Sequence, residues 1–458
     1  MNETVAGIIQ MMRAAAPPGR PVLDEASARR LRELTRSLID ASPGAAAEHG
    51  RFLAIRERGL HLPAARQAEL ARRLHDATVL VTGGTGCVGS ALVARLAALP
   101  TGRLVSVSRG MTNGWPRQDS AEYLHADIRD RRELHRIVTA IRPDVIFHVA
   151  AQRDPGLAEV EVHRTISTNV LGTRNVLATA EAAGVGQVVH ASTGKAQRPY
   201  SPDMYTVSKR AAEWIVADVA ARGRLLCSAA RFTHVVDNSI VYRRLLAWAR
   251  GDVPGTAMVR LHGPDIAFYA QSALESSQLL LLAYLGGEHG ELRVHAITDL
   301  GWPVSLLDLA LAVLAAAESA VGVYFSGYDA GYEQLPFPGL HDPRTAGDVS
   351  PLMNSFEAAA AVPAPGPEID AFRIEFAPDP RLHKLLSALD GSCDRTRDPV
   401  LLRQSLNELS WSLLDATLRA APRSALARSA LLAKAHGSTM SAGHRRVLET
   451  ISDLAGAP

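Results

Sequence analysis

The sequence predicts an α/β fold in which a parallel sheet is covered by helices on both faces. Six short runs rich in β-branched and apolar residues follow one another between Ala77 and Arg231, namely TVLVTG, RLVSVS, EYLHAD, DVIFHVAA, QVVHAST and LLCSAARF. Nearly every interval between them is long enough for a helix, and strands that alternate with helices form parallel sheets. A glycine-rich turn after the first run is typical of a doubly wound sheet that binds a dinucleotide.

The first run continues into VLVTGGTGCVGSALVARL, which places Gly83, Gly86 and Gly89 between a strand and an amphipathic helix. Glycines at these points allow a tight turn, a close approach of the backbone to a pyrophosphate, and close packing of helix on strand. The N-terminus of the helix attracts the phosphate. The strand before and the helix after favour a phosphate-binding turn over an ordinary glycine-rich turn.

The second and third runs end in residues that can discriminate between cofactors. Ser108 and Arg109 stand where NAD enzymes usually offer a carboxylate to the ribose hydroxyls. Because arginine can pair with a 2′-phosphate and stack on adenine, the sequence favours NADP(H), with NAD as the alternative. Arg109 can also be a solvated surface residue. Asp127 can hold the adenine amine or simply form a turn at the strand end.

The fifth run ends in Ser192 and Thr193, and Tyr205 and Lys209 follow on a predicted helix. Side chains four residues apart share one helix face, so we expect the ammonium group to lie near the phenol and to lower its pKa. The phenolate can then act as a general base or acid for an alcohol while a hydride passes to or from a nicotinamide. The pair alone means little, but its place after the glycine-rich turn favours a redox site.

Outside the alternating segment we expect helical regions. The predicted organisation is an N-terminal helical extension over 1–76, a dinucleotide-binding domain over 77–357 with its substrate region mainly in 232–357, a linker at 358–370, and a C-terminal helical appendage over 371–458. The linker is predicted from the proline- and alanine-rich stretch AAAAVPAPGPEID. The apolar stretch SLLDLALAVLAAAESAVGVYF carries Asp308 and Glu318, which indicates a buried helix and strand.

The composition bounds the partners and the location. The 458 residues carry a formal charge of +2 with both signs interspersed, so we expect neither nucleic acid nor a membrane as a partner. Cys87, Cys227 and Cys393 are too few and too scattered for a disulfide framework or a metal cluster, and they fit the cytoplasm. The N-terminus lacks the pattern of a signal peptide. We expect no metal, and a soluble homodimer formed through paired helices.

From about Ala77 to Ala320 the chain resembles the extended short-chain dehydrogenases, and within them the nucleotide-sugar 4,6-dehydratases and epimerases of capsular-polysaccharide biosynthesis. The resemblance lies in TGGTGCVG, SVSR, DIRD, PDVIFHVAAQRDPGLAE, TNVLGTRNVL, STGKA, YTVSK and GGEHGELRVHAITDLGWPVSLLDLA. It implies a Rossmann-type fold and an oxidoreductase chemistry acting on a nucleotide-linked sugar.

The resemblance also implies roles, position by position. The cofactor would meet Gly83, Thr85, Gly86, Val88 and Gly89 at the pyrophosphate, Ser108 and Arg109 at the 2′-phosphate, Asp127 and Ile128 at the adenine, and Ala150, Ala151 and Lys209 at the nicotinamide ribose, with Asn169 as a brace. Tyr205 would start oxidation at sugar C4 with support from Thr193 and Lys209, and Lys195 would remove the C5 proton. The substrate would meet Arg153, His234 and Phe268.

Four departures from the family pattern bear on the reaction. Gly194 replaces the aspartate that protonates the departing hydroxyl in the dehydratases, whereas epimerases carry a small residue there. His234 replaces an asparagine that faces substrate, and it can equally be a satisfied core histidine. Phe268 replaces an arginine on the diphosphate, and PFPGLHDPRTAGDVSPLMN replaces an Arg–Pro–Gly–Glu–Lys motif. Arg260 or Arg344 could restore the lost positive charge.

The sequence therefore predicts an NADP(H)-dependent enzyme that oxidises a ring hydroxyl, at C4, of a nucleotide-linked hexose or N-acetylhexosamine. The overall resemblance favours a 4,6-dehydratase, and Gly194 favours an epimerase or a dehydrogenase. A ketoreductase of secondary metabolism that acts on a substrate without a diphosphate is the alternative that Phe268 favours. A non-catalytic dinucleotide-binding module is the alternative of another class.

Overall fold

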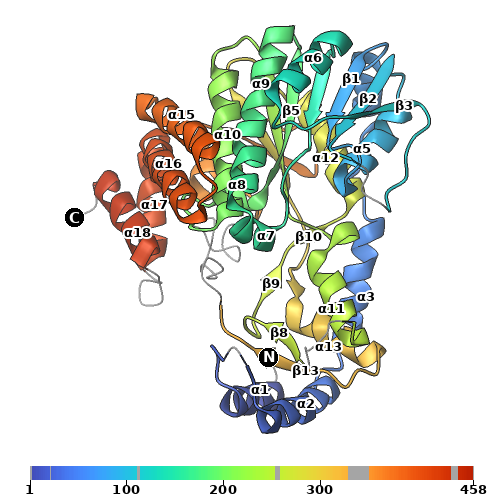
Figure 1. Ribbon diagram of the computed structural model, residues 1–458, viewed down its shortest axis with the longest axis vertical. Coiled ribbons are helices and arrows are strands. Elements are labelled where there is room, and N and C mark those ends of the chain that lie inside the picture. Colours follow the sequence, from blue (N-terminus) through green and yellow to red (C-terminus); the bar gives the residue numbers. More distant parts are fainter. Residues whose placement is uncertain are drawn as a thin grey trace. The chain divides into compact units, whose positions relative to one another are not determined.

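The computed structural model describes residues 3–20, 22–110, 114–252, 258–328, 350–434 and 442–456, which belong to two compact units. The first, here called the helical unit, comprises Met1–Arg58, His234–Ser272 and Leu300–Gln334. The second, called the sheet unit, comprises Gly59–Thr233, Ala273–Asp299 and Leu335–Pro458. Figure 1 labels the elements of both.

The sheet unit is built on nine strands in the order β14-β15-β11-β6-β5-β4-β1-β2-β3. The seven from β3 to β11 are parallel, whereas β15 and β14 are antiparallel to their neighbours. The strands are β1 (Thr78–Thr82), β2 (Arg103–Ser108), β3 (Ala121–His125), β4 (Val145–His148), β5 (Gln187–Thr193), β6 (Leu226–Phe232), β11 (Leu292–Ile297), β14 (Ala361–Val362) and β15 (Ile369–Ile374). The predicted Rossmann-type parallel sheet is confirmed, and the six runs named above form β1 to β6.

Helices cover both faces of this sheet (Figure 1). One layer contains α5 (Cys87–Ala97) and α12 (Ala273–Leu285), with α4 (Ala64–Arg73) beside α12. The other contains α6 (Arg131–Ile141), α9 (Gly172–Ala183) and α10 (Met204–Ala221). Short helical segments join strands to this second layer, and they are α7 (Pro155–Val160), α8 (Val162–Thr165), the π-helix η2 (Ile166–Leu171) and the 3-10 turn η3 (Gly194–Gln197). The central strands β1, β4 and β5 are buried along nearly their whole length, as expected of a parallel sheet covered on both faces, whereas the edge strand β3 is partly exposed.

The C-terminal helices belong to the sheet unit. They are α15 (Pro380–Arg395), α16 (Pro399–Ala420), α17 (Arg423–Lys434) and α18 (Ala442–Ala455), of which α16 packs on α10 and α8. The linker expected at 358–370 is not a linker, because it contains β14 and the start of β15. The segment IDAFRI is mostly buried and pairs with β11 from Ile369 to Ile374, so it forms a strand despite the prolines that precede it.

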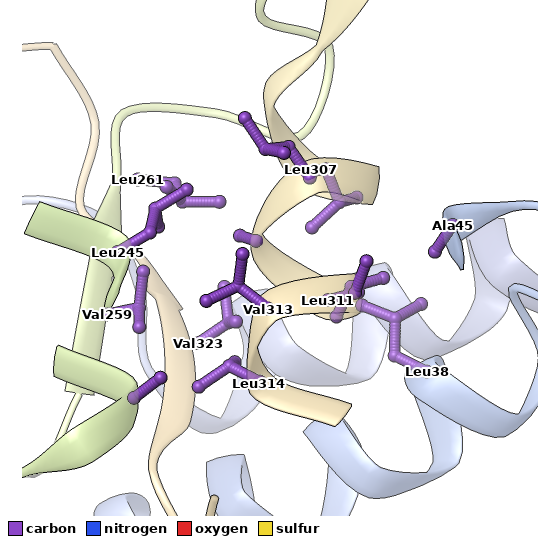
Figure 2. Packing of buried hydrophobic residues seen from close by; sticks show 14 of the residues in the cluster. Leu38, Ala45, Leu245, Val259, Leu261, Leu307, Leu311, Val313, Leu314 and Val323 are labelled. Carbon is purple, nitrogen blue, oxygen red and sulfur yellow. The ribbon is translucent and has the colours of Figure 1, made fainter. Parts of the chain in front are cut away.

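The helical unit has its own apolar core (Figure 2). Its elements are α1 (Glu3–Ala15), α2 (Glu25–Asp40), α3 (Ala45–Ala54), η1 (Ile55–Glu57), β7 (His234–Val235), η4 (Val236–Asn238), α11 (Ile240–Arg250), β8 (Met258–Leu261), β9 (Ala267–Phe268), β10 (Ala270–Gln271), β12 (Val304–Ser305), α13 (Leu306–Ala316) and β13 (Gly322–Phe325). Leu38 and Ala45 pack in one cluster with Leu311 and Val323. The N-terminal helices α1 to α3 therefore share a core with residues far along the chain, and the first segment of this unit ends at Arg58 instead of residue 76.

The apolar stretch after Trp302 forms α13 and β13, the buried helix and strand expected there. No helix within the described ranges has the length and apolarity needed to cross a membrane. The three cysteines are buried and unpaired.

Candidate active site

The turn between β1 and α5 has the close backbone packing that a phosphate-binding turn needs. Gly83 has a φ of +77°, and its amide donates to the Val107 carbonyl at 2.8 Å. A Cβ on Gly89 would overlap the carbonyl oxygen of Gly83, so a larger residue would displace the turn. Thr85 donates its hydroxyl to the Gly110 carbonyl at 3.1 Å, and Val88 lies half-buried in the first turn of α5. The start of α5 thus presents backbone amides of a kind that can hold a diphosphate.

The ends of β2 and β3 carry the groups expected at the adenosine ribose. Burial lowers the pKa of the partly covered Arg109 guanidinium, and the charge of Arg164 lowers it further. Asp127 is bound by Arg129, whose Nη2 lies 2.6 Å from its carboxylate. The Ser108 hydroxyl is buried and has no partner among the described residues. An orphaned hydroxyl beside an exposed arginine fits a ribose phosphate.

Asn169 in η2 connects the loop after β4 to helix α10. Its amide oxygen accepts from the Gln152 amide at 2.8 Å, and its Nδ2 donates to the Gln152 carbonyl at 3.0 Å and to Ser208 Oγ at 3.0 Å. It therefore fixes the loop after β4, which contains Ala150 and Ala151, against α10. The role of a brace that the resemblance implies for Asn169 stays a prediction.

The predicted catalytic side chains gather where β5 ends and α10 begins. Thr193 is the last residue of β5, and its hydroxyl is hydrogen-bonded to Tyr205, the second residue of α10. Asp203 caps α10 by accepting from the Thr206 amide at 2.7 Å, which fixes the first turn of the helix. The nearby charge of Arg153 also acts on Tyr205. Thr193, Tyr205 and Arg153 are thus brought together.

Lys209 lies on the same face of α10 but is held by the strand. Its Nζ donates to the Ala191 carbonyl at 2.7 Å and lies 3.4 Å from His190 Nε2. Burial lowers the pKa of Lys209 to about 8, and the charge of Glu213 opposes the shift. Burial lowers the pKa of His190 well below its usual range, so the imidazole is neutral.

The expected lowering of the Tyr205 pKa by Lys209 is not observed. Burial raises the pKa of Tyr205, and the hydrogen bond from Thr193 only partly opposes this. The reason is geometric, because the Lys209 ammonium is bound to the Ala191 carbonyl and not to the phenol. The tyrosine is therefore protonated at neutral pH in the protein alone, which suits it to donate a proton.

Lys195 lies over the ring of Tyr205. Its Nζ is 5.9 Å from the ring centroid, within the range of a cation–π contact. Burial lowers the pKa of Lys195, and the charge of Asp203 opposes this. The lysine stands in η3, directly after Gly194.

Gly194 contacts a side chain from a distant part of the sequence. A Cβ at this position would lie 2.5 Å from Leu352 Cδ2 and 3.3 Å from its Cγ. A side chain at residue 194 would therefore have to displace the terminal methyl group of Leu352. The sequence did not reveal this contact.

A buried network of four charged side chains lies behind these residues, and it was not predicted. Arg231 is fully buried and bonds to Glu213 at 2.8 and 2.9 Å and to Glu357 at 2.7 Å. Arg210 adds longer contacts of 3.4 Å to both carboxylates. Ser192 donates to Glu213 at 2.5 Å, so the network reaches the active-site strand. A local signal for this network was the spacing of Arg210 and Glu213, which lie three residues apart on one helix.

The other predicted substrate residues lie in the helical unit. The rings of His234 and Phe268 lie 4.6 Å apart, and His234 Nε2 is 2.6 Å from Ser239 Oγ. Arg260 lies over the ring of Tyr324 at 5.5 Å. Arg344 falls outside the described residues. The role of His234 and Phe268 in substrate binding stays a prediction.

Comparisons with known proteins agree with this geometry. Residues 79–244 match the model described as the NAD dependent epimerase/dehydratase family. Capsular polysaccharide biosynthesis protein CapD of Staphylococcus aureus is 25% identical over 285 residues, covering 58% of this chain and 46% of that protein. A UDP-glucose 4-epimerase of Mycolicibacterium smegmatis is 37% identical over 120 residues, covering 25% of this chain and 38% of that protein.

The chain thus spans less than half the length of either curated relative. Among solved structures, the X-ray structure of Pen from Bacillus thuringiensis is similar with a TM-score of 0.54 at 19% identity, covering 66% of this chain and 88% of that one. At that identity the likeness shows the fold, which is the Rossmann-type fold described above.

Proposed function

We propose that the protein oxidises a ring hydroxyl of a nucleotide-linked sugar, at C4, with NADP⁺ as the hydride acceptor, and returns or exchanges the hydride afterwards. One observation carries this proposal. Thr193, Tyr205 and Lys195 gather at the carboxyl end of β5, on the sheet edge where parallel α/β sheets bind their ligands.

The chain's own residues have distinct tasks in this reaction. Tyr205 takes the hydroxyl proton of the sugar during oxidation and gives it back on reduction. Thr193 orients the phenol, and Lys209, fixed by the Ala191 carbonyl, holds positive charge on the same helix face. The oxidised nicotinamide would add positive charge near the phenol, and that charge would lower the pKa of Tyr205.

The dinucleotide would be held by the turn after β1 and by the ends of β2 and β3. Nicotinamide dinucleotides accept and return a hydride, which the side chains of this protein cannot do. Arg109 supports NADP(H), because no carboxylate ends β2 to meet the ribose hydroxyls and the orphaned Ser108 hydroxyl lies beside it. NAD remains the alternative cofactor, since the family matched by residues 79–244 is described as NAD dependent.

The sugar nucleotide is proposed from the relatives. The curated name of one is a UDP-glucose 4-epimerase, and that of another is a capsular polysaccharide biosynthesis protein. A ketoreductase on a substrate without a diphosphate is the second candidate, because Phe268 and His234 form an aromatic pair at positions where the family carries an arginine and an asparagine. The two candidates differ in how they use the cofactor.

The test is the stoichiometry of NADP⁺ with UDP-glucose or UDP-N-acetylglucosamine as substrate. An epimerase or dehydratase converts many sugars per cofactor, whereas a dehydrogenase consumes one cofactor per sugar. We expect catalytic use of NADP⁺ in the wild type and in Tyr123→Phe, a tyrosine on β3 away from the site. Turnover of neither sugar, with NADP⁺ bound, would contradict the proposal and favour the ketoreductase.

A further inference from the structure

The C-terminal helix α16 packs beside α10, the helix that carries Tyr205 (Figure 1). Arg403, Asn407 and Trp411 follow one another at intervals of four residues, so they share one face of α16. The helix lies outside residues 79–244, which match the family model. The family match therefore assigns no role to this face.

Glu159 of α7 connects α16 to the first turn of α10. Its Oε1 accepts from the Met204 amide at 2.7 Å, and Met204 is the first residue of α10 and the neighbour of Tyr205. Arg403 binds this glutamate twice, since Nη1 donates to the carboxylate and Nη2 donates to the backbone carbonyl. The first amides of a helix have no partner within the helix, so a carboxylate that binds one of them fixes the start of the helix. Arg403 thus holds the acceptor of the amide next to Tyr205.

The loop between η3 and α10, residues 198–203 and here called the entry loop, is bound by the same face of α16. Tyr200 in this loop donates its hydroxyl to Asn407 Oδ1 at 3.0 Å. Its ring stacks on Trp411, with centroids 4.1 Å apart and an interplanar angle of 23°. A stacked pair with a hydrogen bond at one end fixes both the plane and the direction of the tyrosine ring. The entry loop is therefore held by α16 just before α10 begins.

A third contact fixes α16 relative to α10 itself. Arg210, on α10, donates from Nη2 to Thr417 Oγ1 at 3.0 Å, and both side chains are buried. The same arginine lies 3.4 Å from Glu213 and from Glu357, which belongs to α14 (Ser355–Ala358). Breaking buried charged contacts is costly, so the two helices keep one arrangement.

We propose that α16 is a positioning element of the active site, which fixes Tyr205 through Glu159 and the entry loop. Arg403, Asn407 and Trp411 are positioning residues, because they act through Glu159 and Tyr200 and not on the substrate. Transfer of a proton by Tyr205 requires the phenol within hydrogen-bond reach of the sugar hydroxyl, and small displacements of a reacting group slow a reaction strongly. This inference rests on the proposed function, which gives Tyr205 its task.

The first test measures the hold on α10 without any turnover. Arg403→Met removes both bonds to Glu159, and Arg419→Met, near the other end of α16, is the matched control because it breaks a pair with Asp415. The two arginine side chains are 35% and 45% exposed. Amide hydrogen exchange over residues 198–206 is followed in the full chain with NADP⁺ bound. We expect exchange about 10- to 100-fold faster in Arg403→Met than in the wild type and the control, because a charged hydrogen bond is lost. Equal exchange in both variants would overturn the inference.

The second test measures the consequence for the reaction. We expect Arg403→Met to lower the rate of NADP⁺ reduction in a single turnover with UDP-N-acetylglucosamine or UDP-glucose by about 10- to 100-fold, with unchanged NADP⁺ affinity. Arg403→Lys should recover most of the rate, because an ammonium still pairs with Glu159. Asn407→Ala, a milder change on the same face, releases the Tyr200 hydroxyl and provides the same test should Arg403→Met unfold.

The outcomes separate this inference from the proposed function. Faster exchange in Arg403→Met with the same reduction rate as Arg419→Met would overturn the inference, because the hold would then not position Tyr205. Reduction by neither sugar in the wild type would contradict the proposed function. Faster exchange in Arg403→Met would, even so, support the hold of α16 on the first turn of α10.

Discussion

Two parts of the sheet unit differ in how closely they follow the family pattern, namely the turn after β1 and the residues around Gly194. The turn after β1 keeps the glycines of the family, and Gly89 packs closely on the backbone of Gly83. Asn169 of η2, an asparagine that the family also carries, bonds to Gln152 in the loop after β4. The segment 350–357, here called the wall, departs from that pattern, since Leu352 lies against Gly194 and its carbonyl accepts from the buried Arg231. The contrast teaches that the cofactor turn keeps the family pattern, whereas the residues around Gly194 depart from it.

We expect the largest loss of turnover from a change at Tyr205, on which the proposed reaction depends. Tyr205→Phe removes the group that exchanges the hydroxyl proton, so we expect kcat to fall by about 10²–10⁴-fold. Binding of NADP⁺, measured by fluorescence titration, should be unchanged because Phe preserves the packing. Unaltered turnover in this variant would show that Tyr205 takes no part in the reaction, and it would contradict the comparison drawn above.

The ionic network behind the wall should affect stability strongly. Glu357→Gln leaves the buried Arg231 with one carboxylate fewer, and breaking a buried pair costs about 3–5 kcal/mol of unfolding free energy. The matched control is Glu122→Gln, which breaks a pair with Arg103 between half-exposed side chains and should cost under about 1 kcal/mol. Urea unfolding of both variants measures the difference. Similar losses in the two would show that the network does not anchor the wall.

The buried lysine of the site predicts a pH dependence. Burial lowers the pKa of Lys209 to about 8 in the folded protein, from 10.5 for an exposed lysine, so the unfolded chain binds the proton more tightly. The stabilising contribution of Lys209 is therefore complete above pH 10.5 and is lost as the pH falls through about 8. Lys209→Met should flatten the rise in stability over this window by about 3 kcal/mol at most. Parallel pH profiles of the two proteins would contradict the shift.

The smallest expected effect concerns the choice between NADP⁺ and NAD⁺ at the end of β2. Arg109→Ala removes a cation at the end of β2, and a lost charged hydrogen bond of about 1.5–3 kcal/mol weakens NADP⁺ binding about 10- to 100-fold. NAD⁺ affinity should stay nearly constant because NAD⁺ lacks the 2′-phosphate. Arg103→Ala, on the same strand but at its other end, serves as the control. An equal loss for both cofactors would favour a general role of Arg109 over NADP selectivity.

The sequence predicts the fold well because periodicity and glycine placement are local signals. The six strands from β1 to β6 and the position of Tyr205 after β5 follow from them. The wall does not, because Leu352 lies more than 150 residues from Gly194 along the chain and only the fold brings the two together. The start of β15 was mistaken for part of a linker because a stretch rich in proline and alanine precedes it.

The pKa of Tyr205 shows the same limit in energetic terms. Spacing places Lys209 and Tyr205 on one helix face, yet the ammonium turns to the Ala191 carbonyl. Burial then decides the pKa of the phenol, and burial depends on tertiary packing. Spacing in the sequence does not show which hydrogen-bond partner a side chain takes, so it does not predict a pKa that depends on that partner.

In the proposed reaction, Tyr205 supports hydride transfer from a nucleotide-linked sugar. The most direct measurement is a single-turnover experiment in which wild-type protein with bound NADP⁺ is mixed with UDP-N-acetylglucosamine or UDP-glucose, and the absorbance of reduced nicotinamide is followed. We predict a transient rise in the wild type and none in Tyr205→Phe, with equal cofactor binding in both. No rise in the wild type when both ligands are bound, or the same rise in Tyr205→Phe, would contradict the account.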